Sequence, residues 1–160
     1  MCEVCCEVCR GRSRDDVDRD TVRSIERYGW AVQAVGGDRL HPPWAYTVGL
    51  HLYGQPELVV TGMAARRAHT LLNERAEHHV RHTGEPPVPG TGMSLRDGPT
   101  IEFVELPHPD AHLFTAVRLL GPGVRAVQIV WADDRGRWPW ERGFRGRRGG
   151  QPVLGPRGRR

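Results

Sequence analysis

The run VRAVQIVWAD, residues 124–133, most constrains how this chain can fold, because apolar residues occupy both alternating faces of a predicted strand. A strand that is apolar on both faces must be covered on both sides, so we expect it in the middle of a sheet with other elements packed above and below it. Gln128 lies inside this run, and its amide needs hydrogen-bond partners if it is buried. The sequence therefore predicts a layered domain built around this strand.

Two helices are predicted from capping and periodicity. The first begins at Ser13, is acidic in its first turn, where the helix dipole favours negative charge, and stops at Gly29. The second carries apolar residues at helical spacing over residues 68–80. Its cap is expected at Thr61 or Gly62.

A third helix is expected over residues 109–120, where Pro109 and Asp110 mark the start. Short β-like runs separate the helices, and strands are predicted over residues 30–35, 44–50, 56–62, 100–107 and 124–133. The order α-β-β-β-α-β-α-β, with hairpin-length links in its first half, predicts an α+β fold. We expect a single domain with a mainly antiparallel sheet of about five strands and three helices.

The chain of 160 residues fits one domain. We divide it into a Cys-rich N-terminal arm (residues 1–12), the α+β domain (residues 13–155) and a basic C-terminal tail (residues 156–160). Residues 1–134 hold 14 Arg and 18 acidic residues, net −4, whereas residues 135–160 hold nine Arg and one Glu, net +8, which gives the total of +4. The body is acidic, so nucleic acid is not an expected partner.

Five motifs follow one another in the order GWAVQAV, PPWAYTVGL, PELVVTGM, AVQIVWADDRGRWPW and QPVLG. In this order they resemble the bacterial domain-of-unknown-function family 4262, over about residues 22–155. The resemblance and the absence of lysine together suggest an actinobacterial origin. The resemblance implies no particular reaction, because the family has no established activity. Its members commonly begin with one Cys-x-x-Cys pair, whereas here the pair is doubled.

All four cysteines lie in the arm, in two consecutive Cys-Glu-Val-Cys units formed by Cys2, Cys5, Cys6 and Cys9. Two thiolates separated by two residues can supply half of a tetrahedral zinc site. Because Cys5 and Cys6 are adjacent, their side chains cannot easily bind the same ion, and a four-thiolate site within the arm is not expected. Three readings stay open: one pair binding zinc or iron with ligands from elsewhere or from a second chain, a redox pair, and no specific role.

The metal reading predicts stoichiometric zinc or iron in protein purified under reducing conditions without chelators. Changing Cys2 and Cys5 together, or Cys6 and Cys9 together, to serine is expected to remove the metal, because serine does not supply a thiolate. Elemental analysis of the purified protein measures this directly. Metal-free wild-type protein would count against the site.

Two polar segments beside predicted strands supply candidate catalytic groups. The loop segment YTVGLHLYGQPE contains four of them: Tyr46, Thr47, His51 and Glu57. The other segment is the turn after residue 132, where Asp133 and Asp134 could bind a divalent cation or share a proton. If the two segments lay within about 10 Å of each other, acid–base or divalent-metal catalysis would be available to them.

Three further residues are candidates for ligand binding: Trp131, Trp138 and Gln151. The indole rings could stack on a planar ligand, and Gln151 opens the segment QPVLG, which is apolar enough to dock on the domain. We expect a ligand- or protein-binding or regulatory module, with the enzyme as the alternative. The expected partner is a small molecule or a protein, and association into a homo-oligomer is left open.

Several classes of protein are disfavoured. The sequence contains no Gly-rich phosphate loop, no Gly-x-Ser-x-Gly and no His-Glu-x-x-His. The complete absence of lysine excludes Schiff-base chemistry. No apolar run is long enough for a membrane span, and no secretory signal pattern is present, so a cytoplasmic location is expected.

Overall fold

The computed structural model describes residues 11–146 and 150–156. Its elements follow in the order α1 (Arg14–Tyr28), β1 (Ala31–Val35), β2 (Trp44–Val48), η1 (Leu50–Tyr53), β3 (Glu57–Thr61), α2 (Ala65–Glu77), η2 (His78–Thr83), β4 (Gly92–Ser94), β5 (Thr100–Leu106), η3 (Pro109–Ala111), α3 (Phe114–Leu120) and β6 (Ala126–Trp131). Here η1 and η3 are 3-10 turns and η2 is a π-helical turn. None of the described helices is long and apolar enough to cross a lipid bilayer.

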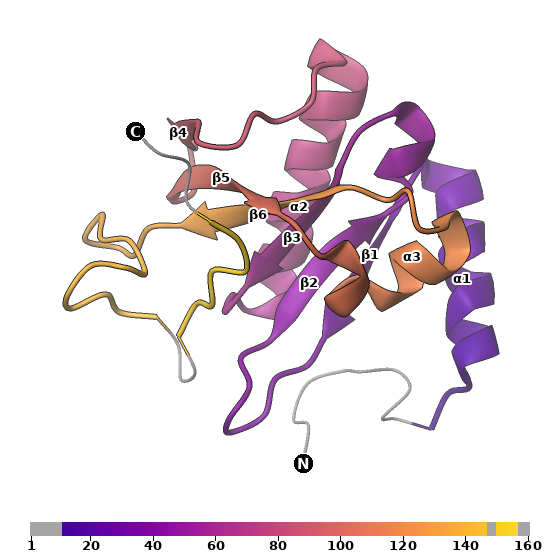
Figure 1. Ribbon diagram of the computed structural model, residues 1–160, viewed down its shortest axis with the longest axis horizontal. Helices are drawn as coiled ribbons and strands as arrows, with labels where there is room; N and C mark the ends of the chain where they lie inside the picture. Colours follow the sequence, from indigo (N-terminus) through magenta and orange to yellow (C-terminus); the bar gives the residue numbers. More distant parts are fainter. Residues whose placement is uncertain (1–10, 147–149, 157–160) are drawn as a thin grey trace.

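The described strands form one six-stranded sheet in the order β1-β2-β3-β6-β5-β4 (Figure 1). All neighbouring strands are antiparallel except β3 and β6, which are parallel. With three α-helices in the described chain, the predicted α+β class and mainly antiparallel sheet are confirmed. The strand missing from the prediction is β4, whose three residues are all exposed and therefore show no apolar alternation.

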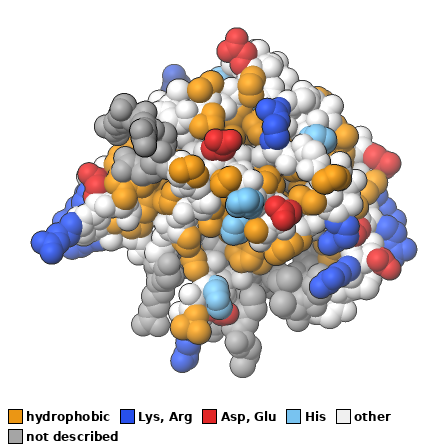
Figure 2. Space-filling model, in the orientation of Figure 1, with side chains coloured by type: hydrophobic (Ala, Val, Ile, Leu, Met, Phe, Trp, Pro, Cys, Tyr) orange, Lys and Arg blue, Asp and Glu red, His pale blue; other side chains and the backbone are white. Residues whose placement is uncertain are grey.

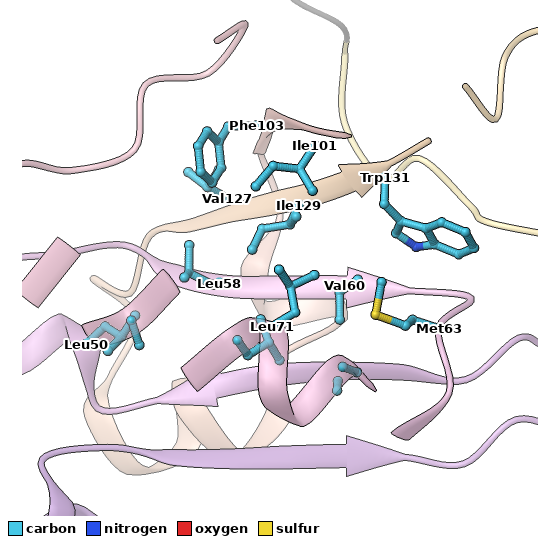
Figure 3. Packing of buried hydrophobic residues seen from close by; sticks show 14 of the residues in the cluster. Leu50, Leu58, Val60, Met63, Leu71, Ile101, Phe103, Val127, Ile129 and Trp131 are labelled. Carbon is cyan, nitrogen blue, oxygen red and sulfur yellow. The ribbon is translucent and has the colours of Figure 1, made fainter. Parts of the chain in front are cut away.

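The strand β6 lies inside the sheet, and all six of its residues are buried, as the apolar run on both of its faces predicts. The helix α2 covers one face of the sheet, and α1 and α3 cover the other (Figure 1). On the α2 face, side chains from β3, β5 and β6 meet Leu71 of α2 (Figure 3). The layered arrangement therefore follows from the need to cover both faces of β6.

The first helix has the predicted ends. The Ser13 hydroxyl accepts a hydrogen bond from the N–H of Asp16, and Gly29 closes the helix with φ 99°. The predicted cap of α2 is wrong, because Ala64 holds that position. Thr61 still belongs to β3, and a chain that leaves a strand needs intervening residues before its first helical turn.

The third helix is shorter than predicted. Residues Pro109–Ala111 form the separate turn η3, and α3 begins only at Phe114. Between them, His112 and Leu113 leave helical geometry, with φ −132° and −107°. The Leu113 side chain is completely buried in the core on this face, so burial of one leucine interrupts the helix that the local pattern favours.

The C-terminal strap, residues 150–155, packs against β6 through side-chain amides. Gln151 Oε1 accepts from the Trp131 N–H, and Gln151 Nε2 donates to the Trp131 carbonyl. Gln128 donates to the Pro152 carbonyl at 2.7 Å and accepts from the Leu154 N–H at 2.7 Å. Buried Gln128 therefore has the partners that its place in an apolar strand requires.

Candidate functional site

The sheet separates the two groups of predicted catalytic residues. Tyr46 and Thr47 lie on β2, His51 lies in η1, and Glu57 begins β3. In the parallel pair, Glu57 lies opposite Ala126, at the start of β6. Asp133 is seven residues beyond Ala126, which at about 3.3 Å per residue is roughly 23 Å along the strand direction. The two segments therefore lie at opposite ends of the sheet and do not form one site.

Glu57 is a completely buried carboxylate that organises the turn η1. One oxygen accepts from the N–H groups of Gly49 (2.9 Å) and His51 (3.0 Å), and the other accepts from the Thr47 hydroxyl (2.6 Å). Thr47 Oγ1 in turn accepts from the N–H of Leu58. Burial raises the pKa of Glu57, although these hydrogen bonds act in the opposite direction. The network gives Glu57 and Thr47 a structural role.

The Asp133 carboxylate also bonds to groups within the protein and has a structural role. It accepts from the backbone N–H groups of Arg135, Arg137 and Arg145 and pairs with the Arg137 guanidinium. Burial by itself raises the pKa of this carboxyl, but the hydrogen bonds outweigh that effect and hold its pKa below the usual range. Asp134, the other member of the predicted pair, is exposed. The turn is therefore satisfied without a cation.

The predicted ligand-binding residues also bond within the protein. Trp131 and Gln151 hydrogen-bond each other, as described above, and the Trp131 indole N–H donates to the Thr61 carbonyl. The Trp138 ring stacks on Trp140, with ring centroids 5.3 Å apart. The hydrogen bonds of Trp131 and Gln151 therefore hold the strap against the end of β6, and these polar groups are not directed at a ligand.

The four cysteines of the arm lie outside the described residues. Within residues 11–146 and 150–156, no group of three or more His, Cys, Asp or Glu side chains is placed to hold a metal ion. The adjacent rings of His78 and His82 stack at 6.4 Å, and burial lowers the pKa of His78. The three readings of the arm, with zinc or iron binding as one of them, therefore stay open.

A large groove of the described chain lies along β1, at the edge of the sheet, where the sequence had indicated no site. This groove, which we call the β1 groove, has a volume of about 1560 Å³. On its outer side β1 has no neighbouring strand, and within the described chain no group accepts from or donates to the outward backbone of Ala31–Val35. The groove thus exposes an unpaired strand edge.

One wall of the β1 groove is polar and comes from α2. It presents His69, Asn73, Glu74 and Glu77. The Asn73 side chain accepts from the Trp30 indole N–H at 2.9 Å, which fixes α2 against the start of β1. Further along, Arg81 donates to the Tyr28 carbonyl, and its guanidinium lies 5.1 Å from the Trp30 ring centroid.

The opposite wall comes from α1, α3 and β2, and it carries an apolar patch next to the end of β1. Phe114 is 54% exposed there, and Val35, Trp44 and Val117 are partly exposed beside it. Tyr46 lies at the base of this wall, and its hydroxyl accepts from the Thr115 N–H. Burial raises the pKa of Tyr46. Figure 2 shows hydrophobic side chains spread across the middle of the face that carries α3.

Among the predicted site residues that the structure describes, Tyr46 alone lines the β1 groove. The other groove residues were not predicted, because their sequence signals are weak. Phe114, Glu74 and Glu77, for example, look like ordinary exposed positions of helices. The usable signal was β1 itself, whose sequence AVQAV has no charge and no proline. Natural edge strands usually carry such residues to prevent unwanted pairing.

A family model described as a domain of unknown function (DUF4262) matches residues 24–145. No curated protein and no solved structure matches the chain.

Proposed function

The chain belongs to the DUF4262 family, and we propose that it is a protein-binding module that takes an extended segment of a partner polypeptide into the β1 groove. The observation that carries the proposal is the unpaired outer edge of β1 inside a groove with walls on both faces. An extended segment can add a strand to such an edge, with main-chain hydrogen bonds supplying affinity.

The two edges of the sheet differ in a way that supports this choice. The edge strand β4 has three residues, all exposed, and such a short edge offers few hydrogen bonds to an added strand. The edge strand β1 has five residues, Ala31–Val35, and four of them are only partly exposed between helices. An edge that is long, uncharged and recessed favours a specific partner over uncontrolled sheet-to-sheet pairing.

The volume and chemistry of the groove also suit a polypeptide. Its volume of about 1560 Å³ exceeds the roughly 300–1,000 Å³ typical of pockets for small ligands. Acid–base catalysis has less support, because the two carboxylate segments lie at opposite ends of the sheet and both carboxylates are used in structural networks. Protein binding is therefore the function that the geometry supports best.

The proposal is tested by selecting peptides from a phage-displayed library of random 12-residue sequences on the purified full-length protein. We expect selected peptides to shift the amide NMR signals of Ala31–Val35. Phe114→Glu is expected to weaken the binding of these peptides by about tenfold or more, because it places a charge within the apolar patch around Phe114. Val88→Glu is the matched control, since Val88 is 59% exposed and lies outside the groove.

Selected peptides whose affinity is the same for wild type and Phe114→Glu, and which leave the β1 amides unshifted, would overturn the proposal. A circular dichroism melt of both variants checks that neither substitution unfolds the domain. Because both side chains are largely exposed, we expect both melting temperatures to stay close to that of the wild type.

A further inference from the structure

The two walls of the β1 groove differ in chemistry, and this difference selects a class of partner sequence. We infer that the segment bound in the groove alternates basic with apolar residues, the basic side chains pointing to α2 and the apolar ones to the wall formed by α1, α3 and β2. The inference rests on the proposed function, because it assumes that the segment extends the sheet beside β1. It adds which side chains such a segment carries.

The alternation follows from strand geometry. Successive side chains of a β-strand point to opposite faces of the sheet, so a strand added beside β1 sends every second side chain toward α2. The existing contacts of β1 show the same division. Val32 and Ala34 pack into the core on the α2 side, whereas Val35 packs into the core on the other side. Gln33 donates to Thr21 of α1.

The α2 wall attracts positive charge. Glu74 is exposed on it, and no described cation forms an ion pair with Glu74. Glu77 is 40% exposed, and its one described ion-pair partner, Arg81, lies at 3.5 Å. Arg81 already donates to the Tyr28 carbonyl and covers the Trp30 ring, so it neutralises this wall only in part.

The other wall has little net charge to offer. Arg118 lines the groove but is paired with Asp18, and Asp20 is paired with Arg12 and Arg23. Arg14 and Asp110 also line the groove, and their charges are opposite.

Between these groups lies apolar surface. Phe114, Val35, Trp44 and Val117 are the residues that an apolar side chain of the partner would cover. Burying a partner's apolar side chain against these residues is favourable by about 25 cal/mol for each Å² of apolar surface removed from water.

The test uses three synthetic peptides with blocked ends and eight residues each: alternating valine and arginine, alternating valine and glutamate, and a block peptide of four valines followed by four arginines. Binding to the full-length protein is measured by fluorescence anisotropy, and the site by amide shifts of Ala31–Val35. We expect the alternating valine–arginine peptide to bind about tenfold more tightly than either of the others, because two favourable ion pairs on a partly exposed wall become two unfavourable ones in the glutamate peptide.

The double variant Glu74→Arg, Glu77→Arg is expected to reverse the order of the two alternating peptides. The double variant Glu85→Arg, Asp134→Arg changes the net charge by the same amount at exposed positions outside the groove, and we expect it to leave the order unchanged. The inference is supported if the preference for the valine–arginine peptide over the valine–glutamate peptide is lost or reversed only in the Glu74→Arg, Glu77→Arg protein. An equal loss of this preference in both double variants would show a long-range charge effect and overturn the inference.

The remaining outcomes separate the inference from the proposed function. If the two alternating peptides bind equally well and both shift the β1 amides, strand addition stands and the charge alternation is wrong. If no peptide shifts the β1 amides, or if the block peptide binds as tightly as the alternating one without shifting them, the groove does not accept an extended segment. The proposed function then fails together with the inference.

Discussion

Replacing Glu57 by alanine is expected to lower the free energy of unfolding by about 3 kcal/mol or more, because two buried donors and one partly buried donor lose their acceptor at once. These donors are the Thr47 hydroxyl and the N–H groups of Gly49 and His51. Each buried donor left without a partner costs about 1–3 kcal/mol. For a chain of this size the melting temperature falls by roughly 10 °C. Urea unfolding and a thermal melt measure the two quantities.

Two variants sharpen this result. Glu57→Gln keeps the size of the side chain and the oxygen that accepts from Gly49 and His51, so its cost is expected to be about 1 kcal/mol. Glu105→Ala is the control, because Glu105 is an exposed glutamate on a strand, and its effect is expected within about 0.5 kcal/mol. A Glu57→Ala protein as stable as Glu105→Ala would contradict the structural role of Glu57.

The Glu57 network also predicts a pH dependence of stability. Burial raises the pKa of Glu57 above its ordinary value of 4.5, so the folded protein retains a proton that the unfolded chain has already released. The stabilisation from this group is complete below pH 4.5 and is lost as the pH rises through the raised pKa. Since glutamine does not ionise, Glu57→Gln should lack this part of the pH dependence.

Replacing Gly62 by alanine is the second change with a large expected effect. A Cβ at this position would lie 2.3 Å from the carbonyl oxygen of Gly150, in the strap. Gly62 also has φ 69°, a conformation that disfavours every residue with a Cβ. We expect a loss of about 2–4 kcal/mol, of which about 1 kcal/mol comes from the backbone and the rest from the collision or from partial release of the strap.

Gly84→Ala separates the two contributions. Gly84 has φ 67°, almost the same as Gly62, but a Cβ there meets nothing within 4 Å. Its loss should therefore be about 1 kcal/mol, the backbone cost alone. Thermal and urea unfolding compare the variants, and hydrogen exchange at the amide of Leu154, which donates to Gln128, reports whether the strap is released. Equal stability of the two variants would show that the strap does not press on Gly62.

Much of the fold could be predicted from local patterns. The Ser13 cap and the Gly29 stop define α1, and the apolar faces of β6 place that strand inside the sheet. The prediction was wrong where long-range contacts decide. Leu113 leaves its helix to enter the core, and β4 is held by β5 without any apolar pattern of its own. Such choices depend on partners that are distant in sequence.

The candidate site was harder to predict for the same reason. Thr47, Glu57 and Asp133 were chosen because polar residues beside apolar strands often take part in chemistry. In this fold each of them satisfies nearby backbone or side-chain groups, which a sequence pattern does not distinguish from catalysis. The β1 groove depends on β1 being an edge, and the order of strands in a sheet is a property of pairing between distant segments.

The parallel pairing of β3 with β6 has a consequence for how the chain reaches this fold. The strands β1, β2 and β3 are neighbours in sequence and can pair through short loops. In contrast, β3 can pair with β6 only after Glu57 and Ala126, which are distant in sequence, have come together. Closing so long a loop costs entropy before any contact repays it, and such topologies fold slowly. Until β6 arrives, the apolar strand β3 is itself a sheet edge, open to the same strand of another chain. Before β6 pairs, the protein therefore exposes the unpaired edges of both β1 and β3, and folding covers only the edge of β3.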